Sequence, residues 1–456
     1  MAKERVLVVG GNAGGMTAAS QLRRLTDDAT ITVFEKGPYV SYGSCGIPFY
    51  IGGIIAEKEG LLARSADSFR EKGIDVRTRH EVLSIDPLAQ KAIVTNLATG
   101  DRFEESWDKL LIATGAIRPQ PPIPGSDAKG VFMIDSPDSG EAVKRWIEEK
   151  KPRRAVVVGG GYIGLEMVDA FADLLGLDVT VIELAPQLMA TLDEGMAEVV
   201  RNHLESRGVN VWLNESVAEF TTQDGVVTGV KTANGAVDAD VVILALGIAP
   251  NGKLAAEAGI ETGIKGAIVT DDTMRTSAPN VWAAGDCVAS KNLLTGKPMH
   301  LALGAVANKQ GRAAAYNMAG LRETFPGVLG TAVCKICGLE IARTGLLERE
   351  LRAEGRAYAA ETIDGYTAAA YMPNAARMRV KMIAELPSQR VVGVQIVGGE
   401  GAAKRIDAAA AAMTAGFSVE QTIYLDFSYA PPLSPLWDPL LQVARNLHGK
   451  INGTTG

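Results

Sequence analysis

The sequence predicts an α/β chain with two Rossmann-like halves followed by an α+β part. Three observations predict this fold class. A β-turn-α-β pattern with a glycine-rich turn lies near the N-terminus, a second copy follows about 150 residues later, and closely spaced strands begin after about Pro326. A repeat of this kind indicates two dinucleotide-binding domains rather than one.

The first copy opens with an apolar run, Arg5–Gly10, which predicts a strand ending at glycines. Helical spacing of apolar residues then predicts a helix over Met16–Leu25. Ile31–Glu35 predicts the next strand. In the second copy the predicted strands are Ala155–Gly159 and Val179–Glu183.

A helix is predicted over Tyr162–Gly176 between these two strands. Lys109–Gly115 and Val241–Gly247 are predicted to be the strands that close the two halves. Pro119, Pro121, Pro122 and Pro124 mark a linker after the first of them.

The last parts of the chain predict a return to the first domain and then a third domain. Val281–Asp286 predicts a strand end and Gly304–Met318 an Ala-rich helix. The later strands, followed by another Ala-rich helix, are predicted at Thr331–Ile336, Ala368–Tyr371, Arg377–Ile383 and Val391–Val397. The expected domains are 1–118 with 250–325, then 119–249, then 326–456.

Composition limits the function. The net charge is -7 without a long Lys/Arg run, which argues against nucleic acid or an anionic membrane as partner. No apolar stretch reaches membrane-spanning length and no signal peptide is recognisable, so a cytoplasmic protein is expected. Four cysteines without disulfide spacing fit a reducing compartment.

The first glycine turn, Gly10–Gly15, can offer backbone N–H groups to a pyrophosphate at a helix start. Asn12 replaces the middle glycine of the usual motif. Glu35 lies 20 residues after Gly15, where an acid accepts hydrogen bonds from an adenosine ribose. The alternative is a glycine-rich turn without a ligand.

The second turn, Gly159–Gly164, keeps all three glycines, and Glu183 lies 19 residues after Gly164. An acid there accepts from a free 2′-hydroxyl and repels a 2′-phosphate. Because no arginine stands just beyond it, NADH is expected in preference to NADPH.

Two dinucleotides in one chain suggest hydride transfer from a nicotinamide to a flavin. Gly285-Asp286 supports this, since a strand-end acid beside a helix start can hold a ribityl hydroxyl. A Gly-Asp pair alone is common in loops.

Cys45 lies in Ser41–Pro48, and proline is tolerated only in the first turn of a helix. Cys45 is therefore predicted at a helix N-terminus, which favours the thiolate. The alternative is a buried structural cysteine. With no second cysteine close by, the oxidised form would be a mixed disulfide, a persulfide or a sulfenic acid.

The other three cysteines are predicted to be buried. Cys334 and Cys337 form a C-x-x-C, for which a redox pair or a zinc site is the alternative. The segment is predicted as a strand, and no second ligand pair completes a metal site, so no metal is expected. Cys287 follows Asp286 and is also predicted as core.

Together these residues resemble the pyridine nucleotide disulfide oxidoreductases over nearly the whole chain. They are most similar to the single-cysteine branch of coenzyme A disulfide reductases, NADH-dependent persulfide or sulfur reductases, and NADH oxidases or peroxidases. Further matching motifs are Ala113-Thr114-Gly115, Ala283–Asp286, Ala307–Arg312, Tyr429–Pro432 and Trp437–Pro439.

The resemblance implies FAD and NADH as cofactors, with NADPH as an alternative, and coenzyme A as substrate or bound thiol. It implies a homodimer formed through a C-terminal dimerisation domain. The residues expected to bind the two cofactors are Gly10, Asn12, Ala13, Gly14, Gly15, Glu35, Lys36, Val82, Ala113, Thr114, Gly115, Gly159, Gly161, Tyr162, Ile163, Gly164, Glu166, Glu183, Gly247, Gly285, Asp286 and Ala302.

The resemblance also implies roles at the sulfur. Cys45 would be the redox-active thiol, and Tyr371 and Tyr429 would reach the partner subunit's active site and stabilise or protonate the leaving thiolate. The alternative for each tyrosine is a packed interface residue. The residues expected to meet coenzyme A are Gln21, Arg24, Ser41, Arg64, Asn308 and Arg312.

The expected reaction passes electrons from NADH through FAD and Cys45 to coenzyme A disulfide, coenzyme A persulfide or polysulfide. An NADH oxidase is one alternative, and Ala13 argues against it because the oxidases and peroxidases have a histidine there. A flavoprotein that delivers electrons to another protein without Cys45 is the other. Ser44 departs from the Asn that often precedes the active cysteine.

Overall fold

The computed structural model describes residues 3–453 and divides into two compact units. Unit 1 comprises the N-terminal part up to Tyr50 together with Ile55–Pro119 and Ile248–Val328. Unit 2 comprises Ile51–Ile54, Gln120–Gly247 and the C-terminal part from Leu329. The predicted division into three domains stays a prediction.

Unit 1 is built on a five-stranded parallel sheet with the order β18-β7-β1-β2-β3. Its strands are β1 (Glu4–Val9), β2 (Ala29–Glu35), β3 (Ile74–Thr78), β7 (Lys109–Ile112) and β18 (Val281–Ala283). Val, Ile and Leu side chains fill the strands and are almost all buried, as expected for a parallel sheet covered on both faces.

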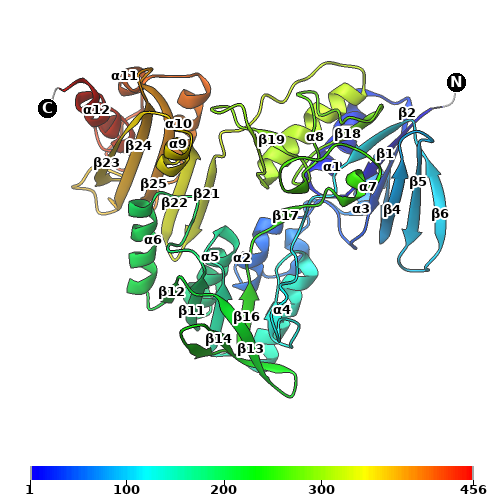
Figure 1. Cartoon of the computed structure of the whole chain (residues 1–456), viewed down its shortest axis with the longest axis horizontal. Helices are drawn as coiled ribbons and strands as arrows, with labels where there is room; N and C mark the ends of the chain where they lie inside the picture. The colour runs from blue at the N-terminus through cyan, green and yellow to red at the C-terminus, as the bar shows by residue number, and fades with distance from the viewer. Residues whose placement is uncertain (1–2, 454–456) are drawn as a thin grey trace. The chain divides into compact units, whose positions relative to one another are not determined.

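Two helices lie side by side against this sheet, α1 (Ala13–Leu25) and α8 (Gly304–Met318) (Figure 1). Their backbones approach so closely that a Cβ at Gly311 would overlap the carbonyl group of Gly14. The predicted strands and helices of this part are confirmed, with ends that differ by a few residues.

The other elements of unit 1 are short or lie beside the main sheet. An antiparallel three-stranded sheet inserts between β3 and β7. The elements are β4 (His80–Asp86), β5 (Lys91–Asn96), β6 (Arg102–Ser106), α2 (Ile47–Ile51), α3 (Ala66–Arg70), α7 (Lys253–Glu257), β8 (Ala116–Ile117), β17 (Ala249–Pro250), β19 (Ser290–Lys291) and β20 (Pro298–Met299).

Unit 2 begins with a second parallel sheet of the order β12-β11-β10-β16-β9. Its strands are β9 (Val131–Phe132), β10 (Arg154–Val158), β11 (Asp178–Glu183), β12 (Asn210–Leu213) and β16 (Val241–Leu244). The accompanying elements are α4 (Pro137–Lys150), α5 (Tyr162–Val168), α6 (Glu194–Ser206), β13 (Val217–Gln223), β14 (Val226–Thr232) and β15 (Ala236–Asp238).

One predicted helix of unit 2 is not continuous. The α-helical part of Tyr162–Gly176 ends at Val168, and the chain continues as a π-helix, η3 (Asp169–Leu174). Periodicity of apolar residues does not separate these two hydrogen-bond patterns, because their hydrogen bonds differ by only one residue in span, i→i+4 against i→i+5.

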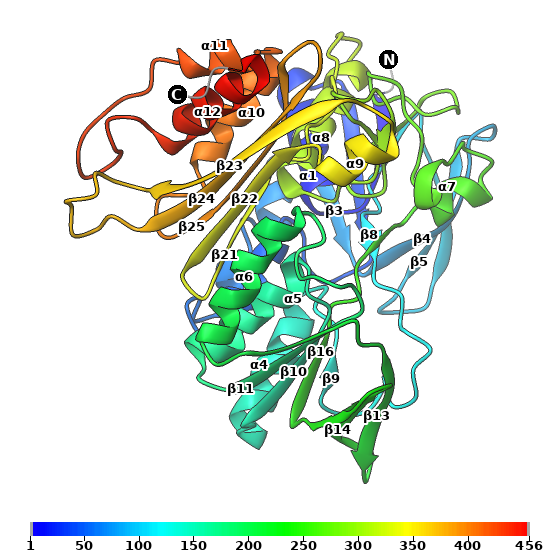
Figure 2. The same cartoon turned by 60° about the vertical axis from the view of Figure 1, so that its left-hand side comes forward.

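The C-terminal part of unit 2 holds an antiparallel sheet of the order β21-β22-β25-β24-β23, with helices α10 to α12 grouped beside it (Figure 2). The strands are β21 (Ala332–Ile336), β22 (Leu339–Gly345), β23 (Tyr358–Tyr366), β24 (Arg377–Glu385) and β25 (Arg390–Gly398). The helices are α9 (Glu348–Ala353), α10 (Arg405–Thr414), α11 (Val419–Ile423) and α12 (Pro439–Asn452).

The strand predicted at Ala368–Tyr371 is wrong. These residues lie in bends and turns after β23, where Ala369 N–H donates to the carbonyl of Pro431 at 2.9 Å and Met372 N–H to that of Ala369 at 2.8 Å. Pro373 directly after this turn cannot supply a ladder N–H. Within residues 3–453, no helix is long and apolar enough to span a bilayer.

Candidate functional site

The first glycine turn joins β1 to α1 in unit 1. Gly10 has a φ of 108°, and a Cβ at Gly15 would overlap the carbonyl of Gly10, so the turn has no room for side chains at these two positions. Both carboxylate oxygens of Glu35 accept backbone N–H groups, from Gly11 at 2.7 Å and from Gly37 at 2.7 Å. The acid predicted to meet a ribose therefore already lies against the turn.

Thr114 and Asp286, two other predicted cofactor residues of unit 1, lie just after the carboxyl ends of the neighbouring strands β7 and β18, where ligands bind in open α/β sheets. Thr114 follows β7 and its hydroxyl donates to the carbonyl of Asn251 at 2.6 Å. Asp286 follows β18, and burial raises its pKa. Val82 lies on β4, and Lys36 pairs with Glu81 at 2.7 Å.

Gln310 on α8 fixes the turn that carries Asp286. Its Oε1 accepts the Gly285 N–H at 2.8 Å, and its Nε2 donates to the Ser290 hydroxyl at 3.0 Å. The side chain is almost completely buried. Gln310 lies inside the Ala307–Arg312 motif, but this role was not predicted. Its only local signal is a polar residue on the buried face of a helix.

Cys45 lies in a short 3₁₀ turn, η1 (Ser44–Gly46), which leads directly into α2. Pro48 is the second residue of that helix, so the predicted helix start is confirmed. The preceding segment is tied to the glycine turn, because Ser41 N–H donates to the carbonyl of Gly11 at 2.9 Å. Ser41 itself has a φ of 53°.

Cys45 is the exposed one among the four cysteines, none of which forms a disulfide. Cys287, Cys334 and Cys337 are buried, which confirms the prediction for them. Burial raises the pKa of all three thiols, that of Cys337 to about 12. Cys45 is therefore the cysteine whose thiol a substrate can reach.

The six residues predicted to meet coenzyme A are all in unit 1, and the side chains of five of them, all but Ser41, have partners there. Gln21 accepts from Arg24 at 3.1 Å, and Asn308 accepts from Thr17 at 2.8 Å. Arg64 lies over the Phe69 ring. The Arg312 guanidinium makes two hydrogen bonds to the Glu323 carboxylate, at 2.7 and 3.0 Å, and stacks on the Tyr316 ring. It is therefore already occupied by protein groups.

The second glycine turn joins β10 to α5 in unit 2 and repeats the first. Gly159 has a φ of 110°, and Glu183 accepts N–H groups from Gly160 at 2.6 Å and from Ala185 at 2.7 Å. A Cβ at Gly164 would overlap the carbonyl of Gly159. Among residues 3–453, no atom outside the local chain lies within 4 Å of where a Gly161 Cβ would be, which leaves that side of the turn open.

Tyr162 and Glu166 lie on the first turns of α5, which packs against β21. Burial, and to a lesser extent the charge of Asp169, raises the pKa of Glu166 to about 7. Burial also raises the pKa of Tyr162. A carboxyl that can carry a proton near neutral pH is typical of a functional site.

Tyr371 and Tyr429 come together in the C-terminal part of unit 2. Both rings are exposed, and a hydrogen bond with Tyr371 raises the pKa of Tyr429. A raised pKa keeps the Tyr429 phenol protonated at neutral pH, so that it can donate a hydrogen bond.

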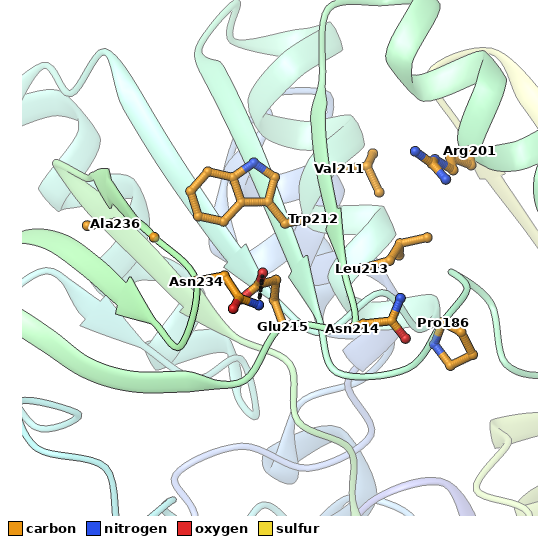
Figure 3. A pocket seen from close by; sticks show the side chains of 10 residues that line it. Pro186, Arg201, Val211, Trp212, Leu213, Asn214, Glu215, Asn234 and Ala236 are labelled. Carbon is orange, nitrogen blue, oxygen red and sulfur yellow. Dashed lines mark hydrogen bonds between the residues drawn. The ribbon is translucent and has the colours of Figure 1, made fainter.

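A cavity of about 590 Å³ opens beside β12 in unit 2 (Figure 3). Trp212 and the pair formed by Asn234 Nδ2 and Glu215 Oε1, 2.8 Å apart, line it. It contains none of the predicted site residues, and nothing in the sequence had indicated it.

The two glycine turns, the paired acids and the half-buried Asp286 suit two dinucleotides, because backbone N–H groups at a helix N-terminus bind phosphate groups. The comparisons with known proteins agree with this geometry. Residues 4–311 match the family model described as pyridine nucleotide-disulphide oxidoreductase, and residues 331–439 match the model of its dimerisation domain.

Named relatives cover almost the whole chain. A NAD(P)H sulfur oxidoreductase (CoA-dependent) of Pyrococcus furiosus is 38% identical over 98% of this chain and 100% of its own length. An NADH oxidase of Methanocaldococcus jannaschii is 37% identical over 98% and 99%.

A solved structure of a NAD-dependent persulfide reductase from A. fulgidus is 40% identical. It has a TM-score of 0.95 over 98% of this chain and 84% of that one. With its two glycine turns, its single exposed cysteine and these matches, the chain belongs to the pyridine nucleotide-disulphide oxidoreductase family.

Proposed function

We propose that this chain uses NADH and bound FAD to reduce a sulfur–sulfur bond of coenzyme A disulfide, a coenzyme A persulfide or polysulfide, with Cys45 as the reacting thiol. The observation that carries the proposal is the contrast among the cysteines. Cys45 is exposed at a helix start on the segment tied to the first glycine turn, whereas the other three thiols are buried. The names of the sulfur-reducing relatives support the substrate class.

FAD would be held by the first glycine turn, Glu35, Thr114 and Asp286 in unit 1. NADH would be held by the second turn and by Glu183, whose carboxylate suits a free 2′-hydroxyl better than a 2′-phosphate. When bound, FAD supplies a two-electron carrier between nicotinamide and sulfur. Tyr162 and Glu166 would lie beside the nicotinamide.

The chemistry at Cys45 is thiol–disulfide exchange. Its thiolate attacks one sulfur of the acceptor, a bond from Cys45 Sγ to that sulfur forms, and the other sulfur leaves as a thiolate that takes up a proton. Two electrons from NADH then break the mixed disulfide and restore the Cys45 thiolate. In total, one NADH and one proton convert one disulfide into two thiols.

The leaving thiolate needs a hydrogen-bond donor. Tyr371 and Tyr429 suit this role because both are exposed and mutually hydrogen-bonded phenols. They would come from the partner subunit of a homodimer, as the match of residues 331–439 to a dimerisation domain favours. A reducing compartment such as the cytoplasm suits these cysteines.

Gln21, Arg24, Ser41, Arg64, Asn308 and Arg312 would meet the coenzyme A moiety. For Arg312 this requires exchange of the Glu323 carboxylate for a phosphate, which a surface ion pair permits because such pairs are weak.

The test compares wild type with Cys45→Ser and, as a matched control, Cys337→Ser. Anaerobic NADH consumption with coenzyme A disulfide should fall at least about 1,000-fold in Cys45→Ser and stay within about twofold in Cys337→Ser. Reduction of ferricyanide by NADH should persist in both variants, because it needs no thiol.

Retained disulfide reduction in Cys45→Ser would contradict the proposal. Oxygen uptake by wild type in step with NADH, without a sulfur acceptor, would instead support an NADH oxidase, the activity named for the Methanocaldococcus relative. Ala13 argues against that outcome, because a cysteine sulfenate would lack a neighbouring histidine.

A further inference from the structure

The segment between Glu183 and α6, residues 184–193, lies against the second glycine turn of unit 2. Met189 N–H donates to the carbonyl of Gly160 at 2.8 Å, and the Gln187 amide donates to the carbonyl of Leu192 at 3.0 Å. Leu188, Met189 and Leu192 are buried. The segment therefore forms one wall of the nucleotide turn.

Two contacts link the middle of this segment to its surroundings. The Thr191 hydroxyl lies 3.5 Å from the Tyr162 hydroxyl, and Arg349 of α9 donates to the carbonyl of Ala190. A hydrogen bond of 3.5 Å is weak. Thr191 therefore depends on the rest of the segment for its position beside Tyr162.

Asp193 ends the segment and is the N-cap residue of α6, which lies alongside β25 (Figure 2). An aspartate at this position usually caps its own helix, but this side chain makes no cap hydrogen bond. It accepts instead from the Gln395 amide at 2.7 Å and the Glu348 N–H at 3.1 Å. Its own N–H donates to Gln395 Oε1 at 2.8 Å.

Lys381 of β24 completes this buried network. Its ammonium group lies 2.9 Å from Asp193 and also pairs with Glu348, which accepts the Tyr358 hydroxyl at 2.8 Å. The Lys381 and Asp193 side chains are 11% and 8% exposed. Charges removed from water to this extent hold their geometry only while every partner is present.

We infer that Lys381 and Asp193 are positioning residues for NADH. The network anchors residues 184–193 to the C-terminal sheet, and the segment in turn holds Thr191 and the wall of the glycine turn in place beside Tyr162. The inference rests on the proposed function, because it takes the second turn as the NADH site.

The test uses the full-length FAD-loaded enzyme with Lys381→Met, and with Arg379→Met as matched control. Arg379 lies two residues earlier on the same face of β24 and pairs with Asp364, but at the surface. In Lys381→Met the dissociation constant for NADH should rise about tenfold and the amides of residues 185–193 should exchange faster. Arg379→Met should change neither.

Two half-reactions distinguish a positioning role of Lys381 at the NADH site from a general structural role: reduction of the flavin by NADH, and its reoxidation by coenzyme A disulfide. Flavin reduction by NADH should slow in Lys381→Met, whereas reoxidation of the dithionite-reduced enzyme by coenzyme A disulfide should stay within about twofold. Unchanged NADH affinity with faster exchange, or equal slowing of both half-reactions, would overturn the inference. If coenzyme A disulfide is not a substrate, the wild-type enzyme itself will show no reoxidation. The NADH dissociation constant and the amide hydrogen exchange then still test the inference.

Should Lys381→Met not retain FAD, Asp193→Asn replaces it, since it keeps the side-chain shape and removes one charge. The same tenfold weaker NADH binding is expected. Wild-type affinity in that variant would equally overturn the inference.

Discussion

The two nucleotide halves of this chain share one plan and differ in the segment that comes after the ribose-side acid. Each has a five-stranded parallel sheet in which four strands follow the same order, β7-β1-β2-β3 and β16-β10-β11-β12, while the fifth strand, β18 or β9, comes from a different point of the chain. Each also has a glycine turn with a φ near 110° and a glutamate that accepts two backbone N–H groups at 2.6 to 2.7 Å. After Glu35 the chain leads to the exposed Cys45. After Glu183 it leads to Asp193, which is buried in an ionic network.

The same Rossmann-like arrangement of sheet, glycine turn and acid can therefore be followed by segments with different roles. In unit 1 the segment after the acid presents the exposed thiol of Cys45. In unit 2 the corresponding segment is anchored to the C-terminal sheet. In both units the sheet, the glycine turn and the glutamate suit a nucleotide. The chemistry of each unit depends on residues outside these shared features.

The largest expected effect comes from closing either turn with a methyl group. In Gly15→Ala and Gly164→Ala the new Cβ would overlap a backbone carbonyl, which typically costs about 1–3 kcal/mol or more of stability. Gly15→Ala should lose FAD, whereas Gly164→Ala should remain yellow and lose at least about 100-fold in kcat/KM for NADH. Flavin absorbance and NADH kinetics check both, and loss of FAD in Gly164→Ala would break the assignment of the halves.

A smaller effect is expected from neutralising the acids. Glu183→Gln should reduce the preference for NADH over NADPH about tenfold, because the charge that repels a 2′-phosphate is gone. Glu35→Gln should leave that preference unchanged and weaken FAD retention. Steady-state kinetics with both nucleotides provide the measurement, and an altered preference in Glu35→Gln would contradict the comparison.

The last prediction concerns stability rather than nucleotide binding. Glu166 occupies the place of Thr17 in the first half, two residues after the last glycine. Its pKa in the folded chain is raised to about 7, so the folded form binds more protons than the unfolded one between about pH 4.5 and 7. Stability from this group is therefore fully present below pH 4.5 and lost as the pH rises through 7, by up to about 3 kcal/mol.

Glu166→Gln removes this loss. Without nucleotide, the melting temperature of Glu166→Gln minus that of wild type should be larger at pH 8 than at pH 5. At pH 8 the wild type has a buried charge at Glu166 that the variant lacks. Thr17→Val in the first half should show no such pH dependence. If the melting temperatures of Glu166→Gln and wild type differ by the same amount at both pH values, Glu166 does not titrate in this range.

Most features that were predicted correctly from the sequence depend on residues close together in the chain. The glycine turns, the acids at the strand ends and the helix start at Cys45 each depend on residues within a short stretch, and each was found where expected. Ala368–Tyr371 failed because a short apolar run is ambiguous when a proline follows it.

Long-range polar contacts could not be predicted. Asp193 and Gln395 are 202 residues apart, and nothing near either residue indicates the other. Asp193 alone predicts an ordinary helix cap. The clamp of Gln310 on Gly285 was missed for the same reason, since burial of a polar side chain is visible only once helix and turn are packed.

The most direct test traps the enzyme during turnover. The FAD-loaded protein is mixed with excess coenzyme A disulfide and limiting NADH under anaerobic conditions, quenched in acid, digested without reductant, and weighed by mass spectrometry. We expect the peptide containing Cys45 to carry the mass of one coenzyme A in disulfide linkage, while peptides with Cys287, Cys334 and Cys337 stay unmodified. Product formation with Cys45 as an unmodified thiol throughout would contradict it.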